Sequence, residues 1–157
     1  MITHHTFIYV TVFVSYFAET PSSIQNELLS FAARKGRDKD RTRVLVVDDE
    51  ELMADSVAAI LNRSGYRATA KYSAKTAMEF VEAECPDVIV SDVIMPEVDG
   101  VQLARAIRRR CPDVRVLLFS GNAATTDVLH RALNEGDSFE VLAKPVHPLQ
   151  LLKALKA

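Results

Sequence analysis

Short apolar segments alternate with amphipathic segments from Arg43 to the end of this 157-residue chain. The apolar segments are rich in β-branched residues and end at turn residues, which is typical of strands buried on both faces. The segments between them carry apolar residues on one helical face, as in Leu52–Ser64, which stops at Gly65. Such alternation predicts an α/β domain, with a parallel sheet covered by helices on both faces.

The expected order is (βα)₅, in which each strand is followed by a helix. The expected strands are Arg43–Val47, Tyr66–Tyr72, Asp87–Ser91, Val114–Phe119 and Phe139–Ala143. The expected helices are Leu52–Ser64, Ala74–Glu84, a segment from Asp99 to just before Pro112, Thr125–Asn134 and Pro148–Lys156. Asp99 and Gln102 have the spacing of a capping box at the start of the third helix.

Charged residues follow three of these strands. Asp48 and Asp49 follow the first strand, Asp92 follows the third, and Lys144 follows the fifth. In open α/β sheets, ligands bind at the carboxyl edge of the strands, so these side chains are expected to share one site. Three carboxylates and a lysine there could hold a divalent metal and handle a phosphoryl group.

Each residue also has a simpler interpretation. Asp48 or Asp49 could cap the helix that follows, and Asp92 could cap a loop. Lys144 could be a solvated lysine. The convergence favours a site, because three carboxylates at one edge repel one another and a fold tolerates this poorly without a metal.

Four motifs in this order resemble the receiver domain of two-component response regulators. They are Val44–Glu50, Ser91–Pro96 with Asp99-Gly100, Leu117–Gly121 and Ala143–Pro145, and the resemblance covers about Arg43 to Ala157. It implies a flavodoxin-like, doubly wound fold with a five-stranded parallel sheet in the strand order 2-1-3-4-5.

The resemblance also implies the chemistry. Asp92 would accept a phosphoryl group as a labile acyl phosphate. Lys144 and the hydroxyl of Ser120 would contact the phosphoryl oxygens. The implied cofactor is Mg²⁺, and its implied protein ligands are Asp48, Asp49, Asp92 and the backbone carbonyl of Ile94.

The switch of the family is only partly present. The resemblance implies that phosphorylation draws Ser120 toward the phosphoryl group, and that an aromatic residue three positions before the lysine then turns inward. In this chain that position is Val141. Phe139 lies on the same side of an extended strand, one step further from the site. We therefore expect a smaller rearrangement, transmitted through the loop after the fourth strand and the helix at 125–134. Asn122, with Ile94, matches positions that tune access of the hydrolytic water.

The expected function is a single-domain response regulator rather than an enzyme. It would take its phosphoryl group from a histidine kinase or phosphotransfer protein and signal by protein contact. A homodimer could form through the face made by 125–134, 139–143 and 148–156. The main alternative is a receiver-like scaffold that binds a partner without phosphorylation. The absence of a Gly-rich loop after the first strand disfavours a nucleotide or flavin site, and Ile94 replaces the second acid of an aspartate phosphatase.

Residues 1–42 are expected to be an extension and charged linker before a receiver domain at 43–157. Thr6–Ala18 is apolar but too short to span a bilayer, which needs about 20 residues. A signal peptide would need a positively charged region before it, but no Lys or Arg precedes this segment. A poorly packed tail, a docking segment and an export signal all stay open. We expect a cytoplasmic protein.

Two further features need an interpretation. Cys85 and Cys111 each begin a Cys-Pro-Asp-Val sequence at equivalent helix-to-strand junctions, and we expect free thiols in a reducing compartment. Arg108–Arg110 are expected to stabilise the negative end of a helix rather than bind nucleic acid. The net charge of −2 does not by itself indicate a protein that binds nucleic acid.

Overall fold

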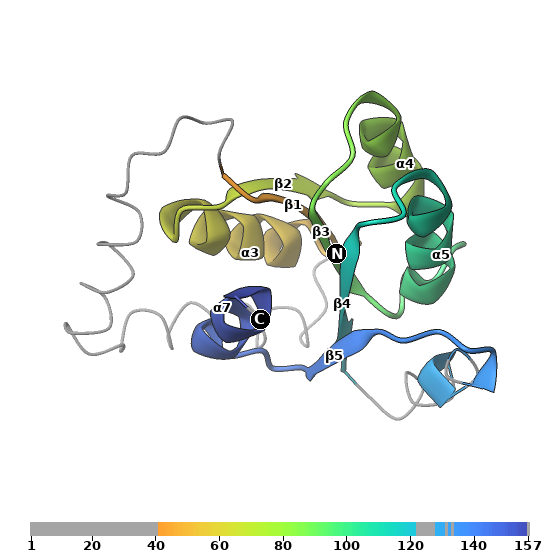
Figure 1. The fold of residues 1–157 in the computed structure, drawn as a ribbon. Helices are drawn as coiled ribbons and strands as arrows, with labels where there is room; N and C mark the ends of the chain where they lie inside the picture. Colours follow the sequence, from red (N-terminus) through yellow and green to blue (C-terminus); the bar gives the residue numbers. More distant parts are fainter. Residues whose placement is uncertain (1–40, 122–127, 131, 133, 157) are drawn as a thin grey trace.

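The computed structural model describes residues 41–121, 128–130, 132 and 134–156 (Figure 1). Its parallel sheet has five strands in the order β2-β1-β3-β4-β5. The strands are β1 (Arg43–Val47), β2 (Arg67–Lys71), β3 (Val88–Asp92), β4 (Arg115–Ser120) and β5 (Glu140–Ala143). The strand order confirms the predicted doubly wound fold.

Helices cover both faces of the sheet. The described helices are α3 (Glu51–Arg63), α4 (Ala74–Ala83), α5 (Gly100–Arg110) and α7 (Pro148–Lys156). Figure 1 shows α3 and α7 on one side of the sheet, with α4 and α5 on the other. Each predicted strand and helix that falls within the described part of the chain is present, with bounds that differ by at most two residues.

Alternate residues of the central strands enter two separate cores. Val44 and Val46 of β1 pack in the cluster that includes Val57 and Leu151, from α3 and α7. Leu45 of β1 points the other way, into the cluster formed with α4 and α5. Because successive side chains of a strand point to opposite faces, burial on both faces produces the unbroken apolar run seen in the sequence.

Helix caps agree in part with the sequence signals. The carboxylate of Asp99 accepts a hydrogen bond from the backbone N–H of Gln102 at 2.8 Å, which is one half of the predicted capping box. The hydroxyl of Ser73 likewise accepts from the N–H of Thr76 at the start of α4. In the predicted helix at 125–134, the described residues 128–130, 132 and 134 are helical.

Predictions for residues 1–40 and for Asn122 lie outside the described residues. Among the described helices, none has both the length and the apolar character needed to cross a bilayer.

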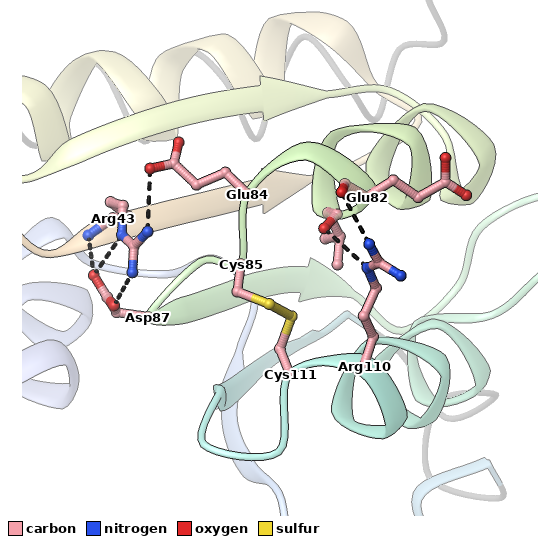
Figure 2. Close-up of a disulfide and its surroundings, with 8 residues drawn as sticks. Arg43, Glu82, Glu84, Cys85, Asp87, Arg110 and Cys111 are labelled. Atoms are coloured by element: carbon pink, nitrogen blue, oxygen red, sulfur yellow. Dashed lines mark hydrogen bonds and ion pairs between the residues drawn. A yellow bond between two sulfur atoms is a disulfide. The ribbon is translucent and has the colours of Figure 1, made fainter.

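The expectation of free thiols is wrong, because Cys85 and Cys111 form a disulfide (Figure 2). Each cysteine lies just before a strand, and those strands, β3 and β4, are neighbours, with Val88 opposite Arg115. The Cα atoms of the cysteines are 5.9 Å apart, a separation that suits a disulfide. The two Cys-Pro-Asp-Val copies are therefore adjacent in space as well as similar in sequence.

Candidate functional site

Three carboxylates from two neighbouring strands meet at the carboxyl edge of the sheet. Asp48 and Asp49 follow β1, and Asp92 is the last residue of β3. One oxygen from each lies within 4.8 Å of the others. Asp48 is buried, Asp92 is half-buried and Asp49 is exposed, so the cluster extends from the core to the surface.

Lys144 brings a positive charge to the same cluster. It follows β5, yet its ammonium nitrogen lies 2.9 Å from the Oδ2 atom of Asp92 and 3.1 Å from that of Asp48. The backbone N–H of Lys144 donates to the carbonyl of Ser120 at 2.7 Å, which fixes where the side chain starts. Gly121 lies beside its path, where a Cβ would make an ordinary contact of 3.5 Å with the lysine Cδ. The lysine thus reaches past β4 to β3.

The charges of this site depend on one another. Burial raises the pKa of Asp48 to about 6, although the Lys144 ammonium and the N–H of Glu50 oppose the rise. Burial alone would lower the pKa of Lys144, but attraction to Asp48 and Asp92 outweighs it and raises that pKa. The lysine therefore stays charged at neutral pH, and its ammonium pairs with two of the three carboxyl groups, those of Asp48 and Asp92.

The loop after β3 folds back closely on Asp92. The Asp92 carboxylate accepts a long hydrogen bond of 3.4 Å from the N–H of Ile94, and the N–H of Gly100 donates to the carbonyl of Val93. A Cβ at position 100 would lie only 2.0 Å from the backbone oxygen of Asp92. Position 100 therefore requires glycine, a role that the sequence interpretation did not assign.

The cluster suits a hard divalent cation. Mg²⁺ prefers oxygen ligands and usually binds through one or two carboxylates, with water or phosphate oxygens completing its octahedron. The exposed Asp49 and half-buried Asp92 are open to such an ion, and the buried Asp48 fixes the inner side of the cluster. The predicted fourth ligand, the Ile94 carbonyl, belongs to the loop bonded to Asp92. The residues present fit Mg²⁺.

The predicted switch residues lie at different places. Ser120 ends β4 and its carbonyl is bonded to Lys144, so it is next to the site. Val141 is 40% exposed on β5. Phe139 precedes β5, packs against the α4–α5 core, and has the guanidinium of Arg108 over its ring at 4.7 Å from the centroid. The aromatic side chain nearest to the family's switch position is thus already engaged.

The fold and this edge of the sheet define a doubly wound α/β protein with an acidic, lysine-containing site. The family model of the response regulator receiver domain matches residues 44–156. The chain therefore belongs to the response regulator receiver family, which acts in two-component systems.

Curated relatives include proteins of different lengths. Regulatory protein VanRc of Enterococcus gallinarum is 30% identical over 114 residues, which cover 73% of this chain and 48% of that protein. The receiver protein CpdR of Brucella abortus is 28% identical over 73% of this chain and 93% of that protein. The sensor kinase CckA of Brucella abortus is 35% identical over 72% of this chain and 12% of that protein. The chain spans about half the length of VanRc and of two further curated relatives.

Solved structures share the fold. The chemotaxis protein CheY4 of Vibrio cholerae is 26% identical with a TM-score of 0.66, covering 74% of this chain and 97% of that one. A response regulator receiver domain protein of Clostridium thermocellum is 27% identical with a TM-score of 0.67, covering 73% of this chain and 91% of that one.

Proposed function

We propose that this receiver accepts a phosphoryl group on Asp92 and signals by phosphorylation-dependent contact with another protein. The observation that carries the proposal is the position of the Asp92 carboxylate. It belongs to the acidic cluster, pairs with Lys144 and has a side chain that is 15% exposed, against 3% for Asp48. Among the carboxylates that pair with the lysine, Asp92 is the one that a phosphodonor can reach.

The residues would act as follows. A carboxylate oxygen of Asp92 attacks phosphorus, an acyl phosphate bond forms, and the phosphorus–nitrogen bond of a donor histidine breaks with its electron pair left on the imidazole. The Lys144 ammonium neutralises charge on the phosphoryl oxygens, and the Ser120 hydroxyl donates a hydrogen bond to one of them. Catalysis here is mainly positioning and charge neutralisation.

Asp48, Asp49 and Asp92, with the Ile94 carbonyl, would hold Mg²⁺. The ion would supply the positive charge that offsets repulsion between the carboxylate and the incoming phosphoryl group. This assignment is supported by the mutual distances of the three carboxylates, of which the Lys144 ammonium pairs with two, Asp48 and Asp92.

The signal would leave the site through Ser120 and the residues after it. Val141 takes the place of an aromatic residue, and Phe139 is held by Arg108, so the proposed rearrangement of 122–134 is small. Phosphorylation can bias the two states only by its differential contacts with them. Amide exchange of 125–134, with and without a phosphoryl mimic, tests this step, and identical exchange would contradict it.

The proposed setting is cytoplasmic, with a histidine kinase or phosphotransfer protein as donor and a downstream protein as target. The match to nearly the whole of CpdR supports a stand-alone receiver at 43–157, preceded by an extension at 1–42. The similarity to part of CckA supports a link to sensor kinases. Direct binding of nucleic acid is not part of the proposal, and a homodimer could use the face of 125–134, β5 and α7.

Intact mass after incubation with acetyl phosphate tests the proposal. The protein should gain one phosphoryl group when Mg²⁺ is present. Asp92→Asn should abolish the gain, and Asp113→Asn, an exposed acid at the opposite edge of the sheet, should keep it. No gain in any sample would favour the scaffold that binds its partner without phosphorylation.

A further inference from the structure

The two cysteines lie at the amino edge of the sheet, opposite the acidic cluster. Cys85 follows the C-cap residue of α4, and Cys111 is the C-cap residue of α5. Their disulfide joins the ends of two neighbouring helices and closes a loop over a sequence separation of 26 residues. That loop contains β3 with Asp92. The cross-link therefore spans the segment that carries the proposed phosphoacceptor, without touching its site.

Noncovalent contacts hold the same helix ends independently. The guanidinium of Arg110 donates to the carbonyls of Val81 and Glu82 at 3.3 and 2.9 Å, joining the end of α5 to the end of α4 (Figure 2). Because these bonds duplicate the connection that the disulfide makes, the two helix ends should stay together when the sulfur–sulfur bond opens.

Arg43 holds the other side of this region. Its guanidinium pairs with Glu84 at 3.1 Å and with Asp87 at 2.7 Å, on either side of Cys85 (Figure 2). These ion pairs anchor the connection between α4 and β3 to the first residue of β1. The backbone around Cys85 therefore keeps its position by contacts that do not involve sulfur.

The disulfide borders an open hollow of about 470 Å³, lined by both cysteines together with Arg43, Arg110 and Arg115. Cys85 is half-buried and Cys111 is 5% exposed, so Cys85 is the residue that a reagent reaches more readily. The thiolate that leaves would then be that of Cys111.

We propose that Cys85 and Cys111 are a reversible redox site, opened by dithiol reductants while the domain stays folded. The site is closed by molecular oxygen, which takes the two electrons and two protons of the thiols and becomes hydrogen peroxide. A thiolate of the dithiol attacks Cys85, the sulfur–sulfur bond breaks, and Cys111 leaves as a thiolate that takes a proton. The second thiolate of the reductant then attacks the mixed disulfide and releases Cys85. The protein gains two electrons and two protons, and the reductant becomes a disulfide.

The proposed cytoplasmic location supports a reversible rather than a static disulfide, and this support rests on the proposed function. Glutathione and thioredoxin keep most cytosolic thiols reduced, so disulfides that form there are usually transient or redox-sensing. In the oxidised state a covalent bond ties both ends of the segment that carries Asp92, whereas in the reduced state only the contacts of Arg43 and Arg110 hold them. Amide exchange in β3 and α5 should therefore be slower in the oxidised protein.

The test is alkylation followed by intact mass, in native buffer, before and after treatment with dithiothreitol. The oxidised protein should take up no alkyl group, and the reduced protein should take up two, since the sequence contains two cysteines. The reduced protein should still unfold cooperatively, with a melting temperature lower by roughly 10 °C. Removal of dithiothreitol in air should restore the higher value. The variant Cys85→Ser with Cys111→Ser should melt near the reduced value whatever the redox conditions.

Three results would overturn the proposal. The first is alkylation of both cysteines in protein already treated with an oxidant. The second is reduction that succeeds only in denaturant, which would mark a static cross-link. The third is loss of cooperative unfolding in the reduced protein. None of these readouts depends on phosphoryl uptake, so a failed acetyl phosphate experiment leaves this test intact.

Discussion

Lys144 reaches past β4 to place its ammonium nitrogen 2.9 Å from the Oδ2 atom of Asp92. The same nitrogen pairs with the buried Asp48, and both contacts lie in a mostly dehydrated environment. Breaking a buried ion pair by removing one partner is strongly destabilising, because the remaining charge stays unpaired.

Lys144→Met should therefore lower the free energy of unfolding in metal-free buffer at pH 7.5 by about 3 kcal/mol. Lys153→Met, on the exposed side of α7, should change it by less than about 0.5 kcal/mol. Denaturant unfolding measures both. Equal values for the two variants would show that the lysine does not neutralise the cluster in the folded protein.

Removal of Mg²⁺ should lower stability if the three carboxylates hold the ion. Saturation to about 100 times the dissociation constant adds roughly 2.7 kcal/mol to the free energy of unfolding. Thermal melting with Mg²⁺ and with a chelator should show the difference for the natural protein and for Asp113→Asn. Asp49→Asn should melt at the same temperature in both buffers, and a normal response of this variant would exclude Asp49 as a ligand.

Gly100→Ala should be severely destabilising, because the new Cβ would lie 2.0 Å from the backbone oxygen of Asp92. Neither backbone can give way cheaply, and we expect a loss of about 3 kcal/mol or more. Gly121→Ala is the matched control, since its Cβ would make ordinary contacts of 3.5 and 3.8 Å with Lys144. Denaturant midpoints compare the two, and a mild effect at position 100 would contradict this packing.

Stability should fall in acid through Asp87. Its hydrogen bonds to Arg43, at 2.7 Å from both the backbone nitrogen and the guanidinium, hold its pKa below the usual value. Because the folded pKa is depressed, the stabilisation is present above about pH 4 and is lost as the pH falls through the folded value. Asp87 is exposed, so solvent screening limits the effect to about 1 kcal/mol.

Asp87→Asn should therefore unfold at lower denaturant than the natural protein at pH 7, and the gap should narrow when the pH is lowered below about 4. Asp113→Asn changes the equivalent residue of the second Cys-Pro-Asp-Val copy, which forms no ion pair within the described part of the chain. Its effect should be small at both pH values. A gap for Asp87→Asn that persists in acid would point to a cause other than the charge.

The fold could be predicted because its strongest determinant is local. Strands buried on both faces leave continuous apolar runs, and those of β1 and β3 end at aspartates. The same local logic placed Asp48, Asp49 and Asp92 at one edge, since parallel strands all end there. The contacts of Lys144 could not be derived this way, because the reach of a side chain past an intervening strand depends on its rotamer.

The disulfide was missed for a different reason. The general rarity of intracellular disulfides outweighed a signal that was present, namely two identical junctions before strands predicted to be neighbours. Had the order 2-1-3-4-5 been applied to those junctions, Cys85 and Cys111 would have been placed side by side. Gly100 was likewise interpreted only as part of a motif, since its close approach to Asp92 depends on how the loop returns to β3.

Strand β3 is five residues long, so about 13 Å separates the Cα atoms of its first and last residues. One end adjoins the sulfur chemistry at Cys85, and the other end is Asp92 itself. At that distance, a small reagent that acts on one end cannot contact the other. Under the two proposals, the chain would therefore carry every combination of oxidised or reduced cysteines with free or phosphorylated aspartate. A single intact-mass spectrum would distinguish these forms. The redox state of the cysteines and the phosphorylation state of the aspartate could therefore be measured together in one sample.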